Sequence, residues 1–384
     1  MNYLIQRRAN LVRHLKEDGV DAYLLTNPVN ITYLSGFTGD SAALLVTAKN
    51  TVLISDSRFE EQIVQECPGL DTHIRPHNKT SAEAIAEVLA KAGLKTIGVE
   101  SAHLTLESLE SFKDKSPKLI FAASPRRVES LRAVKDPSEV EQIRAAVRVA
   151  ERAFAMFIAM VRETDTEKEM VDALDGYIRR AGGHGTSFPP IVAVGERSAL
   201  PHAPPTDRQL LDGSKVIVDW GADLLYKSDI TRTFRSPFGI APTRRNKFER
   251  VGYKFDDVYE LVRKAQEAAV AVIRHGVVAK DVDAAARKVF SDAGLGEFFT
   301  HGLGHGIGLE VHEAPRVRAN SDDILESGMV ITIEPGIYIG ERIDSKTKDK
   351  IGSWGGIRLE DDFLVTKDGA IRLTTLPHDP GAIG

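Results

Sequence analysis

The apolar positions in the first third of the chain alternate between helical spacing and short continuous runs. Leu4, Leu11 and Leu15 recur at the spacing of one helix face, and Gly19 is placed to end that helix. An Ala-rich segment at residues 81–93 shows helical spacing again. Between these helices lie short apolar runs typical of buried strands, at residues 21–26, 42–47, 51–55 and 96–100. Strands that alternate with helices predict an α/β domain.

Prolines and charges interrupt this alternation between residues 123 and 138, in the sequence ASPRRVESLRAVKDPS. We place a domain boundary there, which predicts an N-terminal α/β domain at residues 1–130 and a second domain at residues 131–384. The second domain opens with a helix that continues through Phe154. We expect Ser138 and Glu141 to form its capping box, directly after Pro137.

The rest of the second domain predicts a different organisation. Helical spacing marks three further segments, at residues 164–183, 258–276 and 281–294. Strand-like runs occupy residues 189–195, 215–221, 228–234, 329–339 and 356–366. Hairpin-like strands with helices inserted between them predict an α+β domain, in which the helices pack on an antiparallel sheet.

Composition excludes several classes of partner. The chain has 384 residues, of which 42% are hydrophobic, and a net charge of −5 with basic residues spread along it, so we expect neither nucleic acid nor a membrane surface as a partner. Cys67 is the one cysteine, which excludes a disulfide framework and a thiolate metal site. The first residues lack the apolar core of a signal peptide, and no run of about 18 apolar residues occurs. We therefore expect a cytoplasmic protein.

Two aspartates stand ten residues apart in VDWGADLLYKSDITRTF, residues 218–234. With a three-residue loop at 223–225, this segment forms a hairpin that places Asp219 opposite Asp229, with Cβ atoms about 4.5 to 5.5 Å apart. Two carboxylates at that distance repel each other. They either splay into solvent, as aspartates mostly do, or share a cation.

Three later segments favour the cation. The sequence FFTHGLGHGIGLEVHE carries His301, His305 and His312 on glycine-rich backbone, although a glycine-rich turn could hold histidines without binding anything. Glu334 ends an apolar strand before Pro335. The alternation of a strand puts Arg358, Glu360 and Asp362 on one face, which is also typical of a salt-bridged edge strand. Together these segments supply carboxylates and an imidazole suited to two divalent ions such as Mn²⁺, Co²⁺ or Zn²⁺.

With these motifs in this order, the chain resembles the metal-dependent Xaa-Pro peptidases, the family of aminopeptidase P and prolidase. The resemblance also includes YLSGFTG at residues 33–39 and covers nearly the whole chain. It implies a pita-bread catalytic domain after the smaller α/β domain, two divalent ions with Mn²⁺ preferred, and a homodimer. It implies that Asp219 binds one ion, that Asp229 and Glu360 bridge both, and that His305 and Glu334 complete the other.

The resemblance also implies roles in catalysis. Two divalent ions activate a water and polarise the peptide carbonyl. Glu334 is the candidate that carries a proton to the leaving nitrogen, and His312 and His202 would stabilise the oxyanion. His202 and His312 would also line the substrate site together with His301, and Arg358 would hold the carboxylates in orientation without binding the ions itself. The Asp219 to Asp229 spacing is one residue shorter than usual in the family, and residues 235–257 and 340–354 look longer than in compact members.

The substrate remains open between alternatives. Arg316 lies where prolidases place an arginine that grips the free carboxylate of a dipeptide, yet it could equally be a surface arginine. We favour an aminopeptidase that removes the first residue of short Xaa-Pro peptides, with an Xaa-Pro dipeptidase as the alternative. A catalytically inactive binding protein of the same fold is a third possibility, which metal analysis would test.

Overall fold

The computed structural model describes residues 3–236, 253–343, 350–351 and 353–379. The chain divides into two compact units, Met1–Arg132 and Ala133–Gly384. Of the two segments that look longer than in compact relatives, most of 235–257 and part of 340–354 lie outside the described residues. No helix in the described part of the chain is long and apolar enough to cross a membrane.

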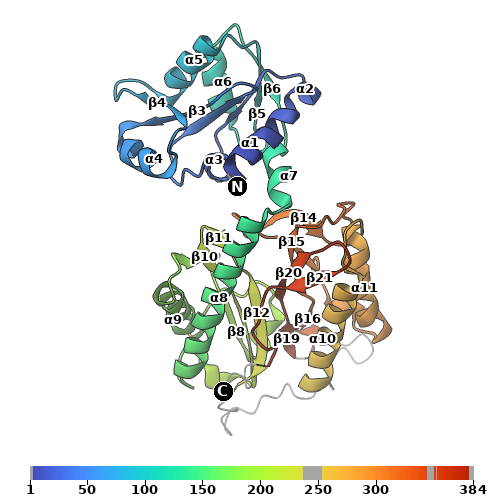
Figure 1. The fold of residues 1–384 in the computed structure, drawn as a ribbon. Coiled ribbons are helices and arrows are strands. Elements are labelled where there is room, and N and C mark those ends of the chain that lie inside the picture. Colours follow the sequence, from blue (N-terminus) through green and yellow to red (C-terminus); the bar gives the residue numbers. More distant parts are fainter. Residues whose placement is uncertain (1–2, 237–252, 344–349, 352, 380–384) are drawn as a thin grey trace. The chain divides into compact units, whose positions relative to one another are not determined.

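The first unit is built on one six-stranded sheet with the order β4-β3-β2-β1-β5-β6, in which β2 alone runs antiparallel to its neighbours (Figure 1). Its strands are β1 (Ala22–Leu25), β2 (Ala43–Thr47), β3 (Thr51–Asp56), β4 (Asp71–Arg75), β5 (Thr96–Val99) and β6 (Ile120–Ala123). Its helices are α1 (Tyr3–Arg13), α2 (Leu15–Asp18), α3 (Pro28–Ser35), α4 (Glu60–Glu66), α5 (Ser81–Ala92) and α6 (Leu106–Lys115), and α7 (Arg127–Ala133) follows. The predicted α/β organisation of this unit is confirmed.

The second unit packs helices on antiparallel sheets, which confirms the predicted α+β class and its pita-bread form (Figure 1). Its helices are α8 (Pro137–Met160), α9 (Glu167–Arg180), α10 (Phe255–Val272) and α11 (Ala279–Asp292). One half of the strands is β7 (Gly185–Thr186), β8 (Ile191–Val194), β9 (Lys215–Trp220), β10 (Ala222–Leu224), β11 (Tyr226–Lys227) and β12 (Ile230–Arg235). The other half is β13 (Gly304–Gly306), β14 (Glu313–Val317), β15 (Val330–Ile333), β16 (Gly336–Ile339), β17 (Arg342–Ile343), β18 (Lys350–Ile351), β19 (Gly355–Arg358), β20 (Asp361–Val365) and β21 (Ala370–Arg372).

Helix α8 begins two residues earlier than its sequence signal indicated. Asp136, not Ser138, is the N-cap: its carboxylate accepts hydrogen bonds from the backbone N–H groups of Ser138 and Glu139. Glu139, not Glu141, completes the capping box. The predicted cap was wrong because Pro137 occupies the first helical position, where its missing N–H costs nothing.

The hairpin that carries the two aspartates has a different register from the expected one. Asp219 pairs with Thr231, and the turn tightens around Leu225, whose φ is +83°. Asp229 therefore lies diagonal to Asp219 on the same face rather than directly opposite. The tighter turn shifts the pairing by two residues, so the shared face is kept and only the distance changes.

Two segments expected as single strands are each broken in two. Residues 329–339 form β15 and β16 in different sheets, separated at Glu334 and Pro335, because proline cannot continue the backbone ladder. Residues 356–366 likewise form β19 and β20, and Glu360 between them makes an isolated antiparallel bridge with Thr231. Both breaks place an acidic residue at the point where two sheets meet.

A hydrophobic core lies beneath these breaks. Ile333, Ile337, Ile357 and Leu359 belong to one buried cluster with apolar residues of α10 and α11. On the other half, Trp220 stacks on Phe154 of α8 with ring centroids 4.2 Å apart. The acidic positions are therefore held by strands whose opposite faces are fixed in the core.

Candidate metal centre

The five predicted ligands converge from four segments of the second unit. Asp219 lies in β9 and Asp229 directly precedes β12, so one hairpin supplies both. His305 lies in β13. Glu334 and Glu360 stand at the two strand breaks. The structure thus brings together residues that are up to 141 positions apart, since 360 − 219 = 141.

The side chains of this group are within reach of a shared ion. His305 Nε2 lies 3.6 Å from Asp229 Oδ2 and 3.7 Å from Glu334 Oε1. Asp229, His305 and Glu360 each offer one ligand atom, and these atoms lie within 4.8 Å of one another. Two ligands around a divalent ion at about 2.1 Å each would stand at comparable separations. The geometry therefore fits a cation between the side chains.

Buried oxygens without a protein partner mark where the cations belong. Asp219 Oδ1, Asp229 Oδ1 and Glu360 Oε1 are buried and, among the described residues, accept no hydrogen bond. A buried carboxylate oxygen without a partner is costly, and most buried polar atoms are satisfied. Oxygen and imidazole ligands with no thiolate suit hard or borderline divalent ions. The residues present therefore fit one or two such ions.

The electrostatics of the group agree with that fit. Burial, followed by repulsion from Asp219, raises the pKa of Glu360 to about 8. Burial and the charge of Glu360 raise the pKa values of Asp229 and Glu334 well above their usual range. Burial and the neighbouring His312 lower the pKa of His305 to about 3, which leaves its imidazole neutral and able to bind a metal. A divalent cation would reverse the carboxylate shifts by stabilising the charged forms.

Two glycines let β13, the strand that carries His305, approach β14 and β15 closely. A Cβ on Gly304 would stand 2.0 Å from the carbonyl oxygen of Thr332, and one on Gly306 would stand 2.0 Å from that of Ala314. Any side chain at either position would push β13 away from β14 or β15. His305, between these two glycines, thereby reaches the carboxylates from a backbone that is packed on both sides.

A second layer of polar contacts orients the carboxylates. Arg358 Nη2 donates to Asp219 Oδ2 at 2.6 Å, and its Nε donates to Thr231 Oγ1 at 3.0 Å. Thr231 Oγ1 in turn donates to Glu360 Oε2 at 2.7 Å. Arg358 therefore contacts one candidate ligand, Asp219, directly and another, Glu360, through Thr231.

Both ring nitrogens of His301, which we expected to line the substrate site, contact other groups of the protein. Its Nδ1 donates to the carbonyl of Gly302 at 2.7 Å, and its Nε2 lies 2.9 Å from the hydroxyl of Tyr338. Because a carbonyl only accepts, Nε2 carries the lone pair and Tyr338 donates to it, while Tyr338 accepts from Arg358 at 2.7 Å. Burial, then the charge of Arg358, lower the pKa of His301 to about 4. Both ring nitrogens are thus engaged within the protein.

Sequence reasoning missed Thr231 and Tyr338. Thr231 could have been found, because it follows Asp229 by two residues and a strand puts both on the same face. Tyr338 gave no such signal, since the break at Glu334 and Pro335 places it in another sheet from β15, the strand that precedes Glu334. Asp362, which we expected on the face of Glu360, accepts from the backbone N–H of Asp229 at 3.3 Å.

The remaining predicted site residues, His202, His312 and Arg316, lie near the histidines of this group. The His312 ring packs against the ring of His305 with centroids 4.3 Å apart. Arg316 pairs with His305 between β14 and β13, and its charge adds to burial in lowering the pKa of His312. The charge of His202 contributes to the lowered pKa values of His301 and His312, so it lies near both. His202, His312 and Arg316 are exposed, as a substrate contact must be.

Comparison with known proteins identifies the class that this fold and site define. Residues 141–367 match metallopeptidase family M24, and residues 7–134 match the creatinase/prolidase N-terminal domain. The chain therefore belongs to metallopeptidase family M24, with a creatinase/prolidase N-terminal domain ahead of the catalytic one. Use of a divalent metal ion is a property that membership of this family implies.

Particular relatives extend over nearly the full chain. A Xaa-Pro dipeptidase of Pyrococcus furiosus is 32% identical over 96% of this chain and 97% of its own length. The solved structure of a Xaa-Pro dipeptidase from Bacillus anthracis has a TM-score of 0.86 at 32% identity, covering 97% of this chain and 98% of that one. The structure of an X-Pro aminopeptidase from Thermotoga maritima has a TM-score of 0.82, also at 32% identity, covering 95% and 98%.

Proposed function

We propose that this protein is a Xaa-Pro dipeptidase that uses two divalent metal ions, with Mn²⁺ preferred over Co²⁺ or Zn²⁺. The single observation that carries the proposal is the group of buried, unpartnered carboxylate oxygens beside the neutral imidazole of His305. An inactive binding protein would have no need to keep so costly a group. We infer the preference for proline from the relatives that are named Xaa-Pro dipeptidase.

Arg316 supports the dipeptidase over the aminopeptidase that we favoured from sequence. It is exposed, its backbone stands opposite that of His305 in the β13–β14 register, and its charge acts on both His305 and His312, so its guanidinium is near the site where a substrate would be held. A guanidinium fork matches a carboxylate, and in a dipeptide the C-terminal carboxylate lies one residue from the scissile bond. Aminopeptidase action on longer peptides remains the second candidate, favoured by the likeness to the Thermotoga maritima enzyme.

The ligand assignment divides the site between two ions. Asp219 would bind one ion, Asp229 and Glu360 would bridge both, and His305 and Glu334 would complete the other. When bound, the ions supply an activated water and polarise the peptide carbonyl. Arg358 and Thr231 hold Asp219 and Glu360 in fixed orientations, so the site needs little rearrangement to receive the ions.

The chain's own residues would carry the remaining steps. Glu334 has a side chain that is 20% exposed, against 6% for Asp229, so it reaches the space open to a substrate and can carry a proton to the leaving nitrogen. His312 would donate a hydrogen bond to the developing oxyanion, with His202 beside it. His301, whose ring nitrogens are engaged, would act on substrate through Tyr338 and Arg358. A homodimer remains our prediction for the assembly.

A metal exchange experiment tests the proposal. The protein is stripped with a chelator, restored separately with Mn²⁺, Co²⁺ and Zn²⁺, and assayed on a Xaa-Pro dipeptide and on a tripeptide with the same first two residues. We expect activity only with metal, highest with Mn²⁺, and a higher kcat/KM on the dipeptide. A higher kcat/KM on the tripeptide would establish the aminopeptidase instead, and a stripped protein that regains neither metal nor activity would support a binding protein.

A further inference from the structure

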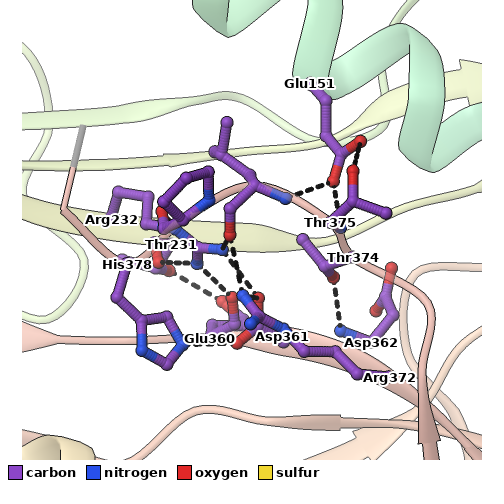
Figure 2. Close-up of polar contacts among 12 residues, drawn as sticks. Glu151, Thr231, Arg232, Glu360, Asp361, Asp362, Arg372, Thr374, Thr375 and His378 are labelled. Carbon is purple, nitrogen blue, oxygen red and sulfur yellow. Dashed lines mark hydrogen bonds and ion pairs between the residues drawn. The ribbon is translucent and has the colours of Figure 1, made fainter. Parts of the chain in front are cut away.

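Asp361, the residue that follows the proposed bridging ligand Glu360, is the centre of a buried polar cluster (Figure 2). Four side chains from other parts of the unit contact its carboxylate: Arg232 at 2.7 Å and Arg372 at 2.8 Å from Oδ1, His378 at 2.9 Å and Gln266 at 3.1 Å from Oδ2. The carboxylate is therefore fully satisfied, and it is 0% exposed.

Arg232 joins this cluster to the backbone of the ligand. Its Nη1 donates to the carbonyl oxygens of Glu360 at 2.7 Å and Thr231 at 2.8 Å. Its Nη2 donates to Asp361, as described, and to the carbonyl of Leu376 at 2.9 Å, and its Nε donates to the carbonyl of Pro377 at 2.8 Å. Every N–H of the guanidinium is thus used, and the side chain is itself 0% exposed.

Glu360 is consequently held at both ends. Its backbone N–H donates to the carbonyl of Thr231 at 3.2 Å, while its own carbonyl accepts from Arg232. Its Oε2 accepts from the hydroxyl of Thr231. Because Glu360 stands at a break between strands, a regular backbone ladder does not fix it. The contacts with Arg232 and Thr231 take the place of that ladder.

The segment 373–378 closes the cluster from the C-terminal side. The backbone N–H of Asp362 donates to Thr374 Oγ1 at 3.1 Å, and the backbone N–H of Leu373 donates to the carbonyl of Asp362 at 2.8 Å. Glu151 of α8 accepts from Thr375 Oγ1 at 2.7 Å and from the Leu376 N–H at 2.7 Å (Figure 2). The segment is thus anchored to a long helix on one side and to the ligand strand on the other.

We propose that Arg232 and Asp361 are positioning residues, which fix the backbone of Glu360 and thereby set the geometry of the two-metal site. The inference rests on the proposed function, in which Glu360 bridges both ions. A buried ion pair adds little net stability compared with an apolar pair of similar volume, so stability alone does not account for Arg232 and Asp361. Residues that orient a ligand from behind contribute about 10-fold to 100-fold in metal affinity or activity.

The test compares two isosteric variants. Asp361→Asn weakens the contact with Arg232 beside the ligand, whereas Asp56→Asn removes a similarly buried charge from the other unit, where Asp56 pairs with Arg58 and Arg75. Mn²⁺ is titrated into each metal-free protein by calorimetry, well below its melting temperature. We expect Asp361→Asn to weaken the binding of at least one ion about 10-fold or more. Asp56→Asn should bind both ions like wild type.

A second measurement separates positioning from general loosening. Hydrogen exchange of the metal-free protein should be faster at the amides of residues 358–362 in Asp361→Asn but not in Asp56→Asn. If Asp361→Asn does not fold, His378→Ala serves instead, because His378 is only one of the groups that contact Asp361 and is partly exposed. We expect His378→Ala to weaken Mn²⁺ binding a few-fold and to speed amide exchange at residues 358–362 by less than Asp361→Asn does.

The outcomes distinguish this inference from the proposed function. If wild type binds two ions and cleaves the dipeptide, but Asp361→Asn and His378→Ala keep wild-type affinity for both ions, Arg232 and Asp361 serve stability alone and the inference is overturned. If wild type binds no Mn²⁺, the proposed function and the inference fail together. A loss of affinity in both Asp361→Asn and Asp56→Asn would also overturn the inference, since the effect would then be unrelated to Glu360.

Discussion

Two neighbouring carboxylates in this protein, Glu360 and Asp361, are equally buried and have opposite surroundings. Asp361 meets cationic side chains that the chain supplies itself. Burial alone would raise its pKa, but Arg232, His378 and Arg372 hold the pKa far below its usual range. Glu360 instead faces other acids, and its pKa rises to about 8. Asp361 is thus neutralised by side chains of the protein, whereas its neighbour Glu360 would be neutralised by a bound cation.

The difference shows how a folded chain can reserve a place for a cation. Around Asp361 each carboxylate oxygen has donors, whereas Glu360, Asp229 and Asp219 each have a buried oxygen with none among the described residues. In the first arrangement the protein itself supplies the counter-charges, so the cluster around Asp361 is rigid without a bound ion. The second is unfavourable until an ion binds, so it selects for divalent cations. The rigid cluster supports the unsatisfied one through Arg232.

The largest effect should come from a substitution among Asp219, Asp229 and Glu360, the acids that have a buried oxygen without a donor among the described residues. Asp229→Asn removes the charge that would bridge both ions, so we expect kcat on a Xaa-Pro dipeptide to fall by about 10³-fold or more at saturating Mn²⁺. Asp223→Asn in the same hairpin is the matched control, because Asp223 pairs with Lys227 and lies outside the ligand group. Near-normal turnover in Asp229→Asn would contradict its bridging role.

Removing one carboxylate charge should change the free energy of unfolding in opposite directions at Asp361 and at Asp229. In chelator, Asp361→Asn should lower the free energy of unfolding by about 3 kcal/mol, because Arg232 loses its buried counter-charge. Asp229→Asn should raise it by about 1 kcal/mol, because one of several mutually repelling acids is gone. Urea unfolding of both metal-free variants measures this directly. If both substitutions destabilise the protein, the two clusters do not differ in the way described.

Stability of the metal-free protein should also depend on pH in a way that metal abolishes. The folded pKa of Glu360, about 8, exceeds its unfolded value of 4.5, so between these values the folded state holds a proton that the unfolded state lacks. Its contribution therefore declines as pH rises toward 8. His305, with a folded pKa of about 3 against 6.5, acts in the opposite direction below pH 6.5. The carboxylate effect should dominate above that value.

Melting temperatures in chelator and in Mn²⁺ between pH 6.5 and 8 provide the measurement. We expect the difference to widen by a few degrees toward pH 8, where the unneutralised acids destabilise only the chelated protein. Lys215, whose pKa burial lowers to about 7, titrates in both samples and cancels. A difference that narrows toward pH 8 would mean that the acids are not the origin of the metal effect.

Local sequence patterns predicted the group of acids that includes Glu360 better than the cluster around Asp361. The candidate ligands each stand beside a local feature, namely a hairpin, a glycine-rich strand or a residue before proline, but their assignment to metal ions came from the family resemblance. The α/β and α+β organisation followed from strand and helix spacing. The Arg232–Asp361 pair joins residues 129 positions apart, and neither residue has a local signal. The hairpin register failed for a related reason, since it depends on a turn at Leu225 with φ of +83° that no turn residue announced.

The smallest effect should come from the outer edge of the satisfied cluster. Arg372 contacts the same oxygen of Asp361 as Arg232 does, but it is 34% exposed, so water replaces much of its contribution. We expect Arg372→Gln to lower the free energy of unfolding by about 1 kcal/mol or less, with Mn²⁺ affinity unchanged, because the contacts of Arg232 with Glu360 remain. Urea unfolding and Mn²⁺ titration, with Lys288→Gln at the exposed pair with Asp292 as control, provide the comparison. A weakened Mn²⁺ affinity in Arg372→Gln would mean that Arg372 also helps to position Glu360, in addition to Arg232, Asp361 and His378.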